Sequence, residues 1–210
     1  PGRTDGWSRK QVSYGHWTAH SADGLHWRLL NQGRRVFEDY RGHADICLGH
    51  DGRFYLAGNG NDSAPDINFW VSDDLIHWEV VENSENGRMI SVLHPRPGYF
   101  DSRLVEPGPY ALLRDKGILL IYNASNASGN NDPRLPRFTY AAGQALFDPE
   151  RPYRLIGRTN DYFIFPDKPY ELTGEVNNVC FVEGMVYFRD KWLLYYGTAD
   201  SRIAVAVKDM

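Results

Sequence analysis

The chain has 210 residues, of which 42% are hydrophobic and 14% aromatic, and it carries a formal net charge of −4. This composition allows a packed core and excludes an intrinsically disordered chain. The negative charge offers no basic face for a nucleic-acid backbone, and no apolar run approaches the roughly 18 residues that span a bilayer. We therefore expect neither nucleic acid nor a membrane as a partner. The 20 glycines and 12 prolines, together with the aromatic residues, favour short strands joined by turns.

Several kinds of site have no signature in the sequence. Cys47 and Cys180 are the only cysteines, and we expect two buried free thiols rather than a disulfide framework or a zinc site. There is no glycine-rich phosphate loop and no nucleophile elbow, so we expect no cofactor and no metal. The chain begins at Pro1 without a methionine. We therefore expect a processed chain or a fragment, whose compartment, cytoplasmic or periplasmic for a bacterial source, cannot be read from its start.

In chain order, the first predicted element is a hairpin built on the motif Ser-x-Asp-x-x-His-Trp. The motif occurs at 21–27 and again at 72–78, and in both copies apolar–polar alternation precedes the serine and resumes at the tryptophan. This pattern predicts two strands joined by a turn, with the aspartate capping the turn. Because His26 and His77 fill the same position of the repeat beside a tryptophan, we expect packing or turn hydrogen bonds from them rather than catalysis.

A second type of hairpin is tighter and more apolar. One hairpin of this type followed by one of the first type makes a four-stranded unit of the size of a propeller blade. These units begin near Asp45, Glu106 and Asn178. The tight hairpins span residues 46–57, 110–122 and 185–196, with turns predicted at 51–52, 115–117 and 190–191.

The repeated units predict an all-β fold, a β-propeller of which about three and a half blades are present. The middle unit has a weaker outer hairpin at 138–142 and 153–157, and the last unit stops within its third strand at 203–207. Residues 1–30 supply only an outer hairpin. No linker suggests a second domain, so we expect a single domain over 1–210. Since a closed propeller needs about four blades or more, we also expect an N-terminal portion to be missing.

An acidic residue stands at or within each predicted inner strand, at Asp45, Glu106 and Glu183. Inner strands border the central channel of a propeller, and acids are disfavoured in strands and are rarely buried unpaired. One interpretation is a carboxylate-lined pocket for general acid/base cleavage of a glycosidic bond. The alternative, which the residue types leave open, is that these acids form ion pairs with arginines and hold the blades together. The candidate arginines are Arg41, Arg103 and Arg202.

Three segments of the chain resemble glycoside hydrolase family 130. The first is Ser102–Pro109, which reads S-R-L-V-E-P-G-P and is followed by Gly117–Asn123, and the second is Tyr140–Asp148. The third lies within 166–207 and contains F-V-E-G at 181–184 and Y-Y-G-T-A-D at 195–200. The segments occur in family order and together cover roughly residues 40–207.

The resemblance implies a five-bladed β-propeller that acts on β-mannosides with inversion of the anomeric centre, either with inorganic phosphate or with water. It implies Asp45 as the general acid, whose proton passes through a sugar hydroxyl in the phosphorylases. It further implies that Asp200 holds the mannosyl unit. Near the sugar we also expect Arg103, Tyr140 and Tyr196.

Two positions depart from the phosphorylase members, which have a glycine in place of Glu106 and no glutamate at position 183. Additional carboxylates repel phosphate and suit the activation of water. We therefore predict an inverting glycoside hydrolase that cleaves β-mannosidic linkages in mannose-containing oligosaccharides, with Glu106 or Glu183 as the base. The first alternative is a β-mannoside phosphorylase that releases mannose 1-phosphate, and the second is a carbohydrate-binding propeller without catalysis. The expected partners are an oligosaccharide substrate and, for a phosphorylase, inorganic phosphate.

Overall fold

The computed structural model describes residues 15–35, 37–38, 44–48, 51–59 and 66–209. Over these residues the chain is built from short antiparallel strands, and its helices are single turns, η1 (Asn31–Gly33) and α1 (Pro169–Leu172). The predicted all-β class is thus confirmed. The chain divides into two compact units, residues 1–41 and 42–210. No helix within the described ranges is long and apolar enough to cross a membrane.

The first unit contains two pairs of short antiparallel strands. β1 (Gly15–His16) pairs with β4 (Phe37–Glu38), and β2 (Ala19–His20) pairs with β3 (Arg28–Leu29). The β2–β3 pair is the predicted first hairpin, and its turn contains the first copy of the Ser-x-Asp motif. The hairpin predicted from the repeat is therefore present.

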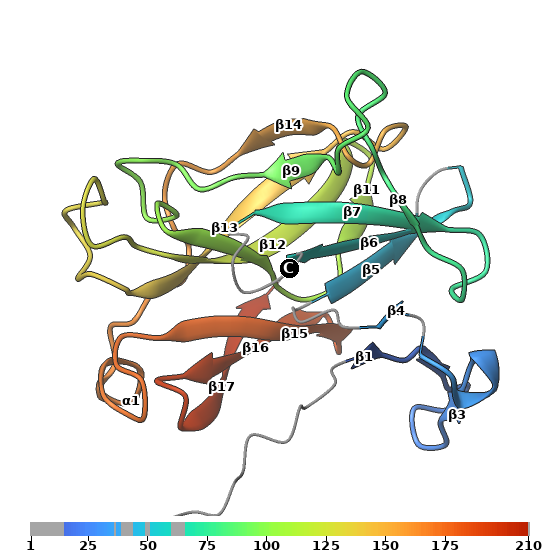
Figure 1. The fold of residues 1–210 in the computed structure, drawn as a ribbon. Helices are drawn as coiled ribbons and strands as arrows, with labels where there is room; N and C mark the ends of the chain where they lie inside the picture. Colours follow the sequence, from blue (N-terminus) through green and yellow to red (C-terminus); the bar gives the residue numbers. More distant parts are fainter. Residues whose placement is uncertain (1–14, 36, 39–43, 49–50, 60–65, 210) are drawn as a thin grey trace, which may run out of the picture. The chain divides into compact units, whose positions relative to one another are not determined.

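In its described residues, the second unit contains three antiparallel sheets (Figure 1). The predicted tight hairpins are confirmed as β5–β6, β11–β12 and β15–β16. The first sheet comprises β5 (Ala44–Leu48), β6 (Phe54–Asn59), β7 (Ile67–Ser72), β8 (Glu79–Val80) and β9 (Ser91–Leu93). The second sheet comprises β10 (Leu104–Pro107), β11 (Leu112–Arg114), β12 (Gly117–Ser125), β13 (Tyr140–Phe147) and β14 (Leu155–Arg158). The third sheet comprises β15 (Cys180–Phe188), β16 (Lys191–Thr198) and β17 (Arg202–Asp209).

The two copies of the Ser-x-Asp motif fold into the same turn. In each, one carboxylate oxygen accepts the backbone N–H of the histidine at 2.8 Å, and the other lies 2.6 Å from Nδ1 of its ring. These bonds hold the pKa of Asp23 and of Asp74 well below the usual range. The largest cause is the ring of His26 for Asp23 and the backbone of His77 for Asp74. The predicted role of both histidines in turn hydrogen bonds is confirmed.

The β15–β16 hairpin illustrates how the local sequence forms the tight turns. Phe188 pairs with Lys191, which leaves Arg189 and Asp190 as the two turn residues. Both have positive φ, 49° and 61°. This combination belongs to a type I′ turn, whose twist matches that of the strands it joins.

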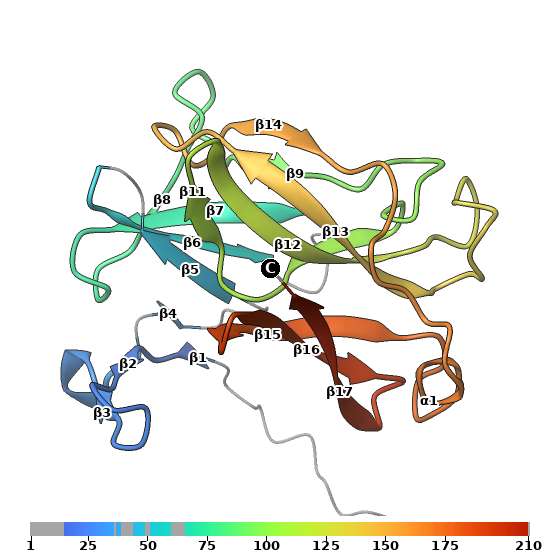
Figure 2. The ribbon, with the colours of Figure 1, turned by 180° about the vertical axis from the view of Figure 1, so that it is seen from behind.

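Buried side chains pack the second sheet of the second unit against the first sheet and against the third. Phe69 of the first sheet packs against Phe147 of the second, with ring centroids 6.0 Å apart. A smaller cluster joins the second and third sheets through residues such as Ile121 and Val182. The second sheet therefore packs against both of its neighbours: β10 and β11 contact the first sheet, and β12 and β13 contact β15. The elements are labelled in Figures 1 and 2. The arrangement of these sheets as propeller blades, the number of blades and the single-domain extent of 1–210 remain predictions.

A buried charge cluster fixes the segment that precedes β10. The fully buried carboxylate of Asp101 lies 2.9 Å from Nη2 of Arg96 and 3.3 Å from Nη1 of Arg158. It also accepts a hydrogen bond from the hydroxyl of Tyr122 at 2.9 Å. Burial is the main cause that raises the pKa of Tyr122 and lowers that of Arg158. Because side chains alternate along a strand, the next residue of β12, Asn123, points to the opposite face.

Candidate active site

Strand β10 presents a carboxylate at the surface of a cavity. Val105 and Pro107 are buried in the core, so alternation along the strand turns Glu106 to the other face, where it is partly exposed. Arg103 lies directly before the strand. Its guanidinium carbon lies 5.3 Å from the ring centroid of Phe138, and Nη1 lies 3.4 Å from Oγ of Ser125. These contacts hold a cation at the rim of the cavity.

Strand β15 supplies an aromatic ring and a second carboxylate. Cys180 and Val182 are buried, whereas Phe181 and Glu183 alternate toward the cavity. The ladder with β16 shifts by one residue between Val182 and Gly184, so Glu183 is the extra residue of a β-bulge. Bulges bend a strand and re-aim a side chain, and they are common beside active sites.

Tyr140, the first residue of β13, connects the second sheet to the third. Its backbone N–H donates to the carbonyl oxygen of Asn178 at 2.9 Å. Its ring lies against that of Phe181, with centroids 5.7 Å apart and planes tilted by 56°. The two rings therefore form a wall that spans the junction between the sheets.

Asp200 reaches the cavity from the turn between β16 and β17. Both Ala199 and Asp200 have positive φ, 45° and 50°. Residues other than glycine in this region cost about 1–3 kcal/mol each and persist only where the surroundings fix them. Here the N–H of Ala199 donates to the carbonyl of Val179 at 3.0 Å, and Oγ of Ser201 donates to the carbonyl of Ala199 at 2.9 Å.

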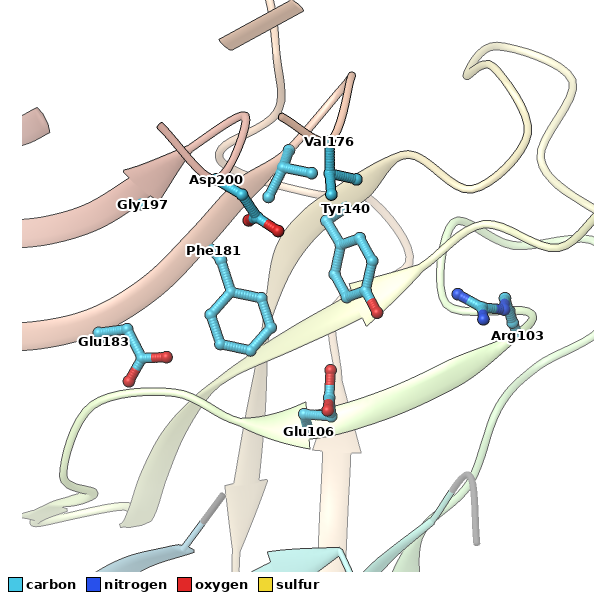
Figure 3. A pocket seen from close by; sticks show the side chains of 9 residues that line it. Arg103, Glu106, Tyr140, Val176, Phe181, Glu183, Gly197 and Asp200 are labelled. Atoms are coloured by element: carbon cyan, nitrogen blue, oxygen red, sulfur yellow. The ribbon is translucent and has the colours of Figure 1, made fainter. Parts of the chain in front are cut away.

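Together these side chains line one cavity of about 570 Å³, a size within the usual range of small-molecule sites. In Figure 3, the carboxylate of Glu106 points toward the hydroxyl of Tyr140, and Arg103 lies beyond that hydroxyl. The ring of Phe181 lies between Glu183 and Tyr140 in the same view. The lining residues are Arg103, Glu106, Tyr140, Val176, Val179, Phe181, Glu183, Gly197 and Asp200.

The charges around the cavity are mainly negative. Over the part of the chain that the structure describes, three carboxylates and one guanidinium line the cavity, which leaves a formal excess of two negative charges on these residues. Burial and then the charge of Glu106 raise the pKa of Tyr140, while the charge of Arg103 and a hydrogen bond to it act in the opposite direction. Tyr140 therefore stays protonated at neutral pH. The cavity combines a hydroxyl donor, proton acceptors and an apolar ring, which suits a polyhydroxylated ligand.

Five of the seven predicted site residues meet in this cavity, namely Arg103, Glu106, Tyr140, Glu183 and Asp200. For Asp45 the structure gives the backbone, which lies in β5 opposite Ala57. The side chain of Asp45 lies outside the described residues, as does Arg41. The role of Asp45 as the acid and the roles of the five residues in the cavity therefore remain predictions.

Tyr196, which we expected near the sugar, is not among the described residues that line the cavity. Its ring is buried, and its hydroxyl donates to Oε1 of Glu171 at 2.8 Å. The physical reason is strand alternation. Gly197 faces the cavity from β16, so its neighbour Tyr196 faces the core. Burial and the bond to Glu171 raise the pKa of Tyr196, and the residue supports the loop that contains α1.

The sequence prediction omitted four residues that line the cavity: Val176, Val179, Phe181 and Gly197. Phe181 carried a usable signal, because it stands two residues before Glu183 on the same strand and so shares its face. Val176 and Val179 come from the loop after α1. No spacing in the sequence indicates where that loop folds back.

The chain is similar to a known protein family and to several individual proteins. The model of family Glyco_hydro_130, described as β-1,4-mannooligosaccharide phosphorylase, matches residues 41–210. A 1,2-β-oligomannan phosphorylase from Thermoanaerobacter sp. (strain X514) is 32% identical over 146 residues, 70% of this chain and 44% of the relative. A β-1,2-mannobiose phosphorylase from the same strain is 33% identical over 115 residues, 55% of this chain and 35% of the relative.

Among solved structures, one similar chain has 32% sequence identity and a TM-score of 0.75, and the match covers 91% of this chain and 56% of that one. That structure was reported with the finding that the GH130 family of mannoside phosphorylases contains glycoside hydrolases that target β-1,2-mannosidic linkages in Candida mannan. The chain thus spans less than half the length of the two curated relatives and about half of this solved structure. All five predicted residues that meet in the cavity fall within the matched range 41–210.

Proposed function

The chain belongs to glycoside hydrolase family 130, and on this premise we propose that it cleaves β-mannosidic linkages in mannose-containing oligosaccharides with inversion at the anomeric carbon. The observation that carries the proposal is the cavity in which Glu106, Glu183 and Asp200 converge from three segments of the chain beside two aromatic rings. Hydrolysis of a glycosidic bond uses carboxyl groups on both sides of the scissile bond, whereas phosphate is itself a nucleophile and needs only the acid. Sugar binding needs hydroxyl partners and an apolar surface.

Within this proposal the residues have distinct roles. Asp45 is the general acid, and its proton reaches the leaving oxygen directly or through a sugar hydroxyl. Asp200 and Tyr140 hold hydroxyl groups of the mannosyl unit, and the ring of Phe181 packs against its apolar face. The bond between the anomeric carbon and the leaving oxygen breaks while an acceptor oxygen bonds to the same carbon from the opposite side.

For the acceptor, the comparisons favour inorganic phosphate. Both curated relatives are named phosphorylases, and so is the family model. This reverses the order of the two candidates predicted from the sequence. In the cavity, Arg103 is the cationic side chain among the described lining residues, and a guanidinium can bind phosphate through two parallel hydrogen bonds. The proposed product is then α-mannose 1-phosphate.

A specific observation keeps hydrolysis as the second candidate. Among the described lining residues there are three carboxylates and one guanidinium, and this excess of negative charge opposes a phosphate anion. In this version Glu106 or Glu183 removes a proton from water as the water attacks the anomeric carbon, and the product is α-mannose. The report of hydrolases within the same family is consistent with this version.

We propose that residues 1–210 form one domain and belong to a five-bladed β-propeller, with the three sheets of the second unit as blades. Supporting this, two of these sheets each contain a path of four successively paired strands, β5–β6–β7–β8 and β10–β12–β13–β14, with one short strand beside it, and the third contains β15–β16–β17. Their first strands, β5, β10 and β15, contain the three predicted acids.

A product analysis tests the function. The purified protein is incubated with β-1,2- and β-1,4-linked mannobiose and mannotriose, with and without inorganic phosphate. Phosphate-dependent α-mannose 1-phosphate supports the phosphorylase, and phosphate-independent α-mannose supports the hydrolase. For the hydrolase, the substitution Glu→Gln at whichever of Glu106 and Glu183 is the base should lower the rate, whereas Glu79→Gln, an exposed change on β8, should leave it unchanged.

The same samples also test the third hypothesis, a carbohydrate-binding propeller without catalysis. That hypothesis predicts binding of mannooligosaccharides by calorimetry, retained in Glu183→Gln, with no turnover under either condition. Absence of both binding and turnover for every mannoside would overturn the proposed function.

A further inference from the structure

One buried amide connects the strands that carry the two glutamates of the cavity. Asn123 of β12 is fully buried. Its Oδ1 accepts the backbone N–H of Val182 at 2.7 Å, and its Nδ2 donates to the carbonyl oxygen of Val182 at 2.9 Å. Nδ2 also donates to the carbonyl oxygen of Pro107 at 3.2 Å. Val182 directly precedes Glu183, and Pro107 directly follows Glu106.

The side-chain amide of Asn123 makes hydrogen bonds that a neighbouring strand would otherwise make, along the edge of β15 that does not face β16. Val182 pairs with Tyr196 on its other side, at the last regular position before the bulge of Glu183. An edge residue without a neighbouring strand leaves its N–H and C=O groups to be satisfied by other partners. Here the side chain of Asn123 satisfies both groups of Val182, so the start of the bulge is fixed to the second sheet.

Close backbone packing at Gly108 reinforces the same junction. A Cβ atom at Gly108 would lie 2.7 Å from the carbonyl oxygen of Ile121 and 3.0 Å from Cγ2 of Val182. The end of β10 therefore reaches Val182 as closely as a residue without a side chain allows. With the amide of Asn123 beside it, this contact leaves little freedom for the two strands to slide.

We infer that Asn123 is a positioning residue, whose amide sets the place of the Glu183 carboxylate relative to Glu106. The inference rests on the hydrolytic version of the proposed function with Glu183 as the base, because in that version the position of the Glu183 carboxylate decides whether it reaches the attacking water. Removal of the amide frees the bulge, and misplacement of a reacting group by about 1 Å can cost 100-fold in rate. Asn123 itself does not line the cavity, so it acts through Glu183 rather than on the substrate.

A kinetic comparison of Asn123→Leu with Tyr122→Phe tests this inference. Leucine branches at Cγ as asparagine does but lacks its donor and acceptor. The control removes a different buried hydrogen bond from the neighbouring residue, on the face of β12 that holds Asp101. We expect Asn123→Leu to lower kcat by about 100-fold with a small change in KM, and Tyr122→Phe to leave kcat within twofold. Folding of both variants is checked by circular dichroism and by Tm.

A double variant separates positioning from a general structural role. If Asn123 acts through Glu183, the combined variant Asn123→Leu/Glu183→Gln should lose at least tenfold less activity than the product of the two single losses. Multiplicative losses, or a normal rate in Glu183→Gln alone, would overturn the inference. A common drop in kcat for Asn123→Leu and Tyr122→Phe would also overturn it.

Crystal structures of the variants distinguish a failure of the inference about Asn123 from a failure of the proposed function. If the unmodified protein cleaves no β-mannoside, the proposed function fails, and the position of Glu183 can still be measured. The inference then requires that the Glu183 carboxylate is displaced in Asn123→Leu and unchanged in Tyr122→Phe. An unmoved bulge in Asn123→Leu contradicts the inference even where the enzyme is active.

Discussion

Replacing Gly174 with alanine tests how the turn that carries Asp200 is held. Gly174 lies in the loop after α1, and a Cβ atom there would overlap the carbonyl oxygen of Ala199 and would lie 2.5 Å from Oγ of Ser201 and 2.7 Å from Cβ of Ala199. The nearest of these atoms belongs to backbone, which cannot rotate away as a long side chain does. The loop and the turn must therefore separate.

The loop and the turn are also joined by hydrogen bonds that this separation would stretch. The N–H of Val176 donates to the carbonyl of Ala199 at 3.3 Å, and the N–H of Glu175 donates to Oγ of Ser201 at 2.9 Å. Overpacking of this kind costs about 1–3 kcal/mol. For a chain of this length, each kcal/mol lowers Tm by about 2–4 °C. We thus expect Gly174→Ala to lower Tm by roughly 2–12 °C.

The matched control is Gly129→Ala. A Cβ at Gly129 meets no atom within 4 Å, and the residue does not have a positive φ. This substitution should leave Tm unchanged or raise it slightly, since alanine reduces the freedom of the unfolded chain. Calorimetry gives both Tm values, and steady-state kinetics on mannobiose should show a higher KM in Gly174→Ala because Asp200 is displaced. Equal Tm values for the two variants would refute the packing argument.

Three further predictions follow from other contacts. Tyr196→Phe should destabilise the fold by about 1–3 kcal/mol, because the buried Glu171 carboxylate loses one donor. The kcat of this variant should be unchanged, and a large loss of kcat would mean that Tyr196 belongs to the site. Leu75→Gly should raise Tm, because Leu75 has a φ of 65° and the left-handed conformation costs about 1–2 kcal/mol for a non-glycine residue. A lower Tm would mean that the side-chain contacts of Leu75 outweigh this strain. The hydrogen bond and charge of Arg134 hold the pKa of Asp132 below 3.8, so its contribution to stability is complete above that pH and is lost as the pH falls through the lower folded-state value. Urea unfolding of Asp132→Asn should accordingly depend less on pH between about 4 and 2 than that of the unmodified protein, and parallel curves would contradict the assignment.

The strands and turns were largely predictable because their causes are local. The Ser-x-Asp motif contains every group that closes its turn, so the two copies at 21–27 and 72–78 make the same bonds wherever they lie. The tight hairpins followed from apolar alternation on both sides of short turns. The sequence alone left open how the three sheets pack, because that packing depends on pairs such as Phe69 and Phe147, which no short spacing relates.

The site was predictable to the extent that strand alternation and the family resemblance together indicated it. They named Arg103, Glu106, Tyr140, Glu183 and Asp200, which meet in one cavity. Alternation also explains why Tyr196 lies outside the described lining of the cavity, since adjacent residues of one strand face opposite sides and the resemblance indicated only the segment.

The sequence by itself determined that this is an all-β chain with repeated hairpins and acids at the starts of its inner strands. Only the tertiary structure decided which of those acids share a cavity and what holds them there. The amide of Asn123 reaches Val182 across 59 positions of the chain, and the bulge at Glu183 becomes apparent only from the register of β15 against β16. Contacts of this kind form between backbone groups of distant strands, and backbone groups are the same in every residue, so the sequence carries no local mark of where they meet.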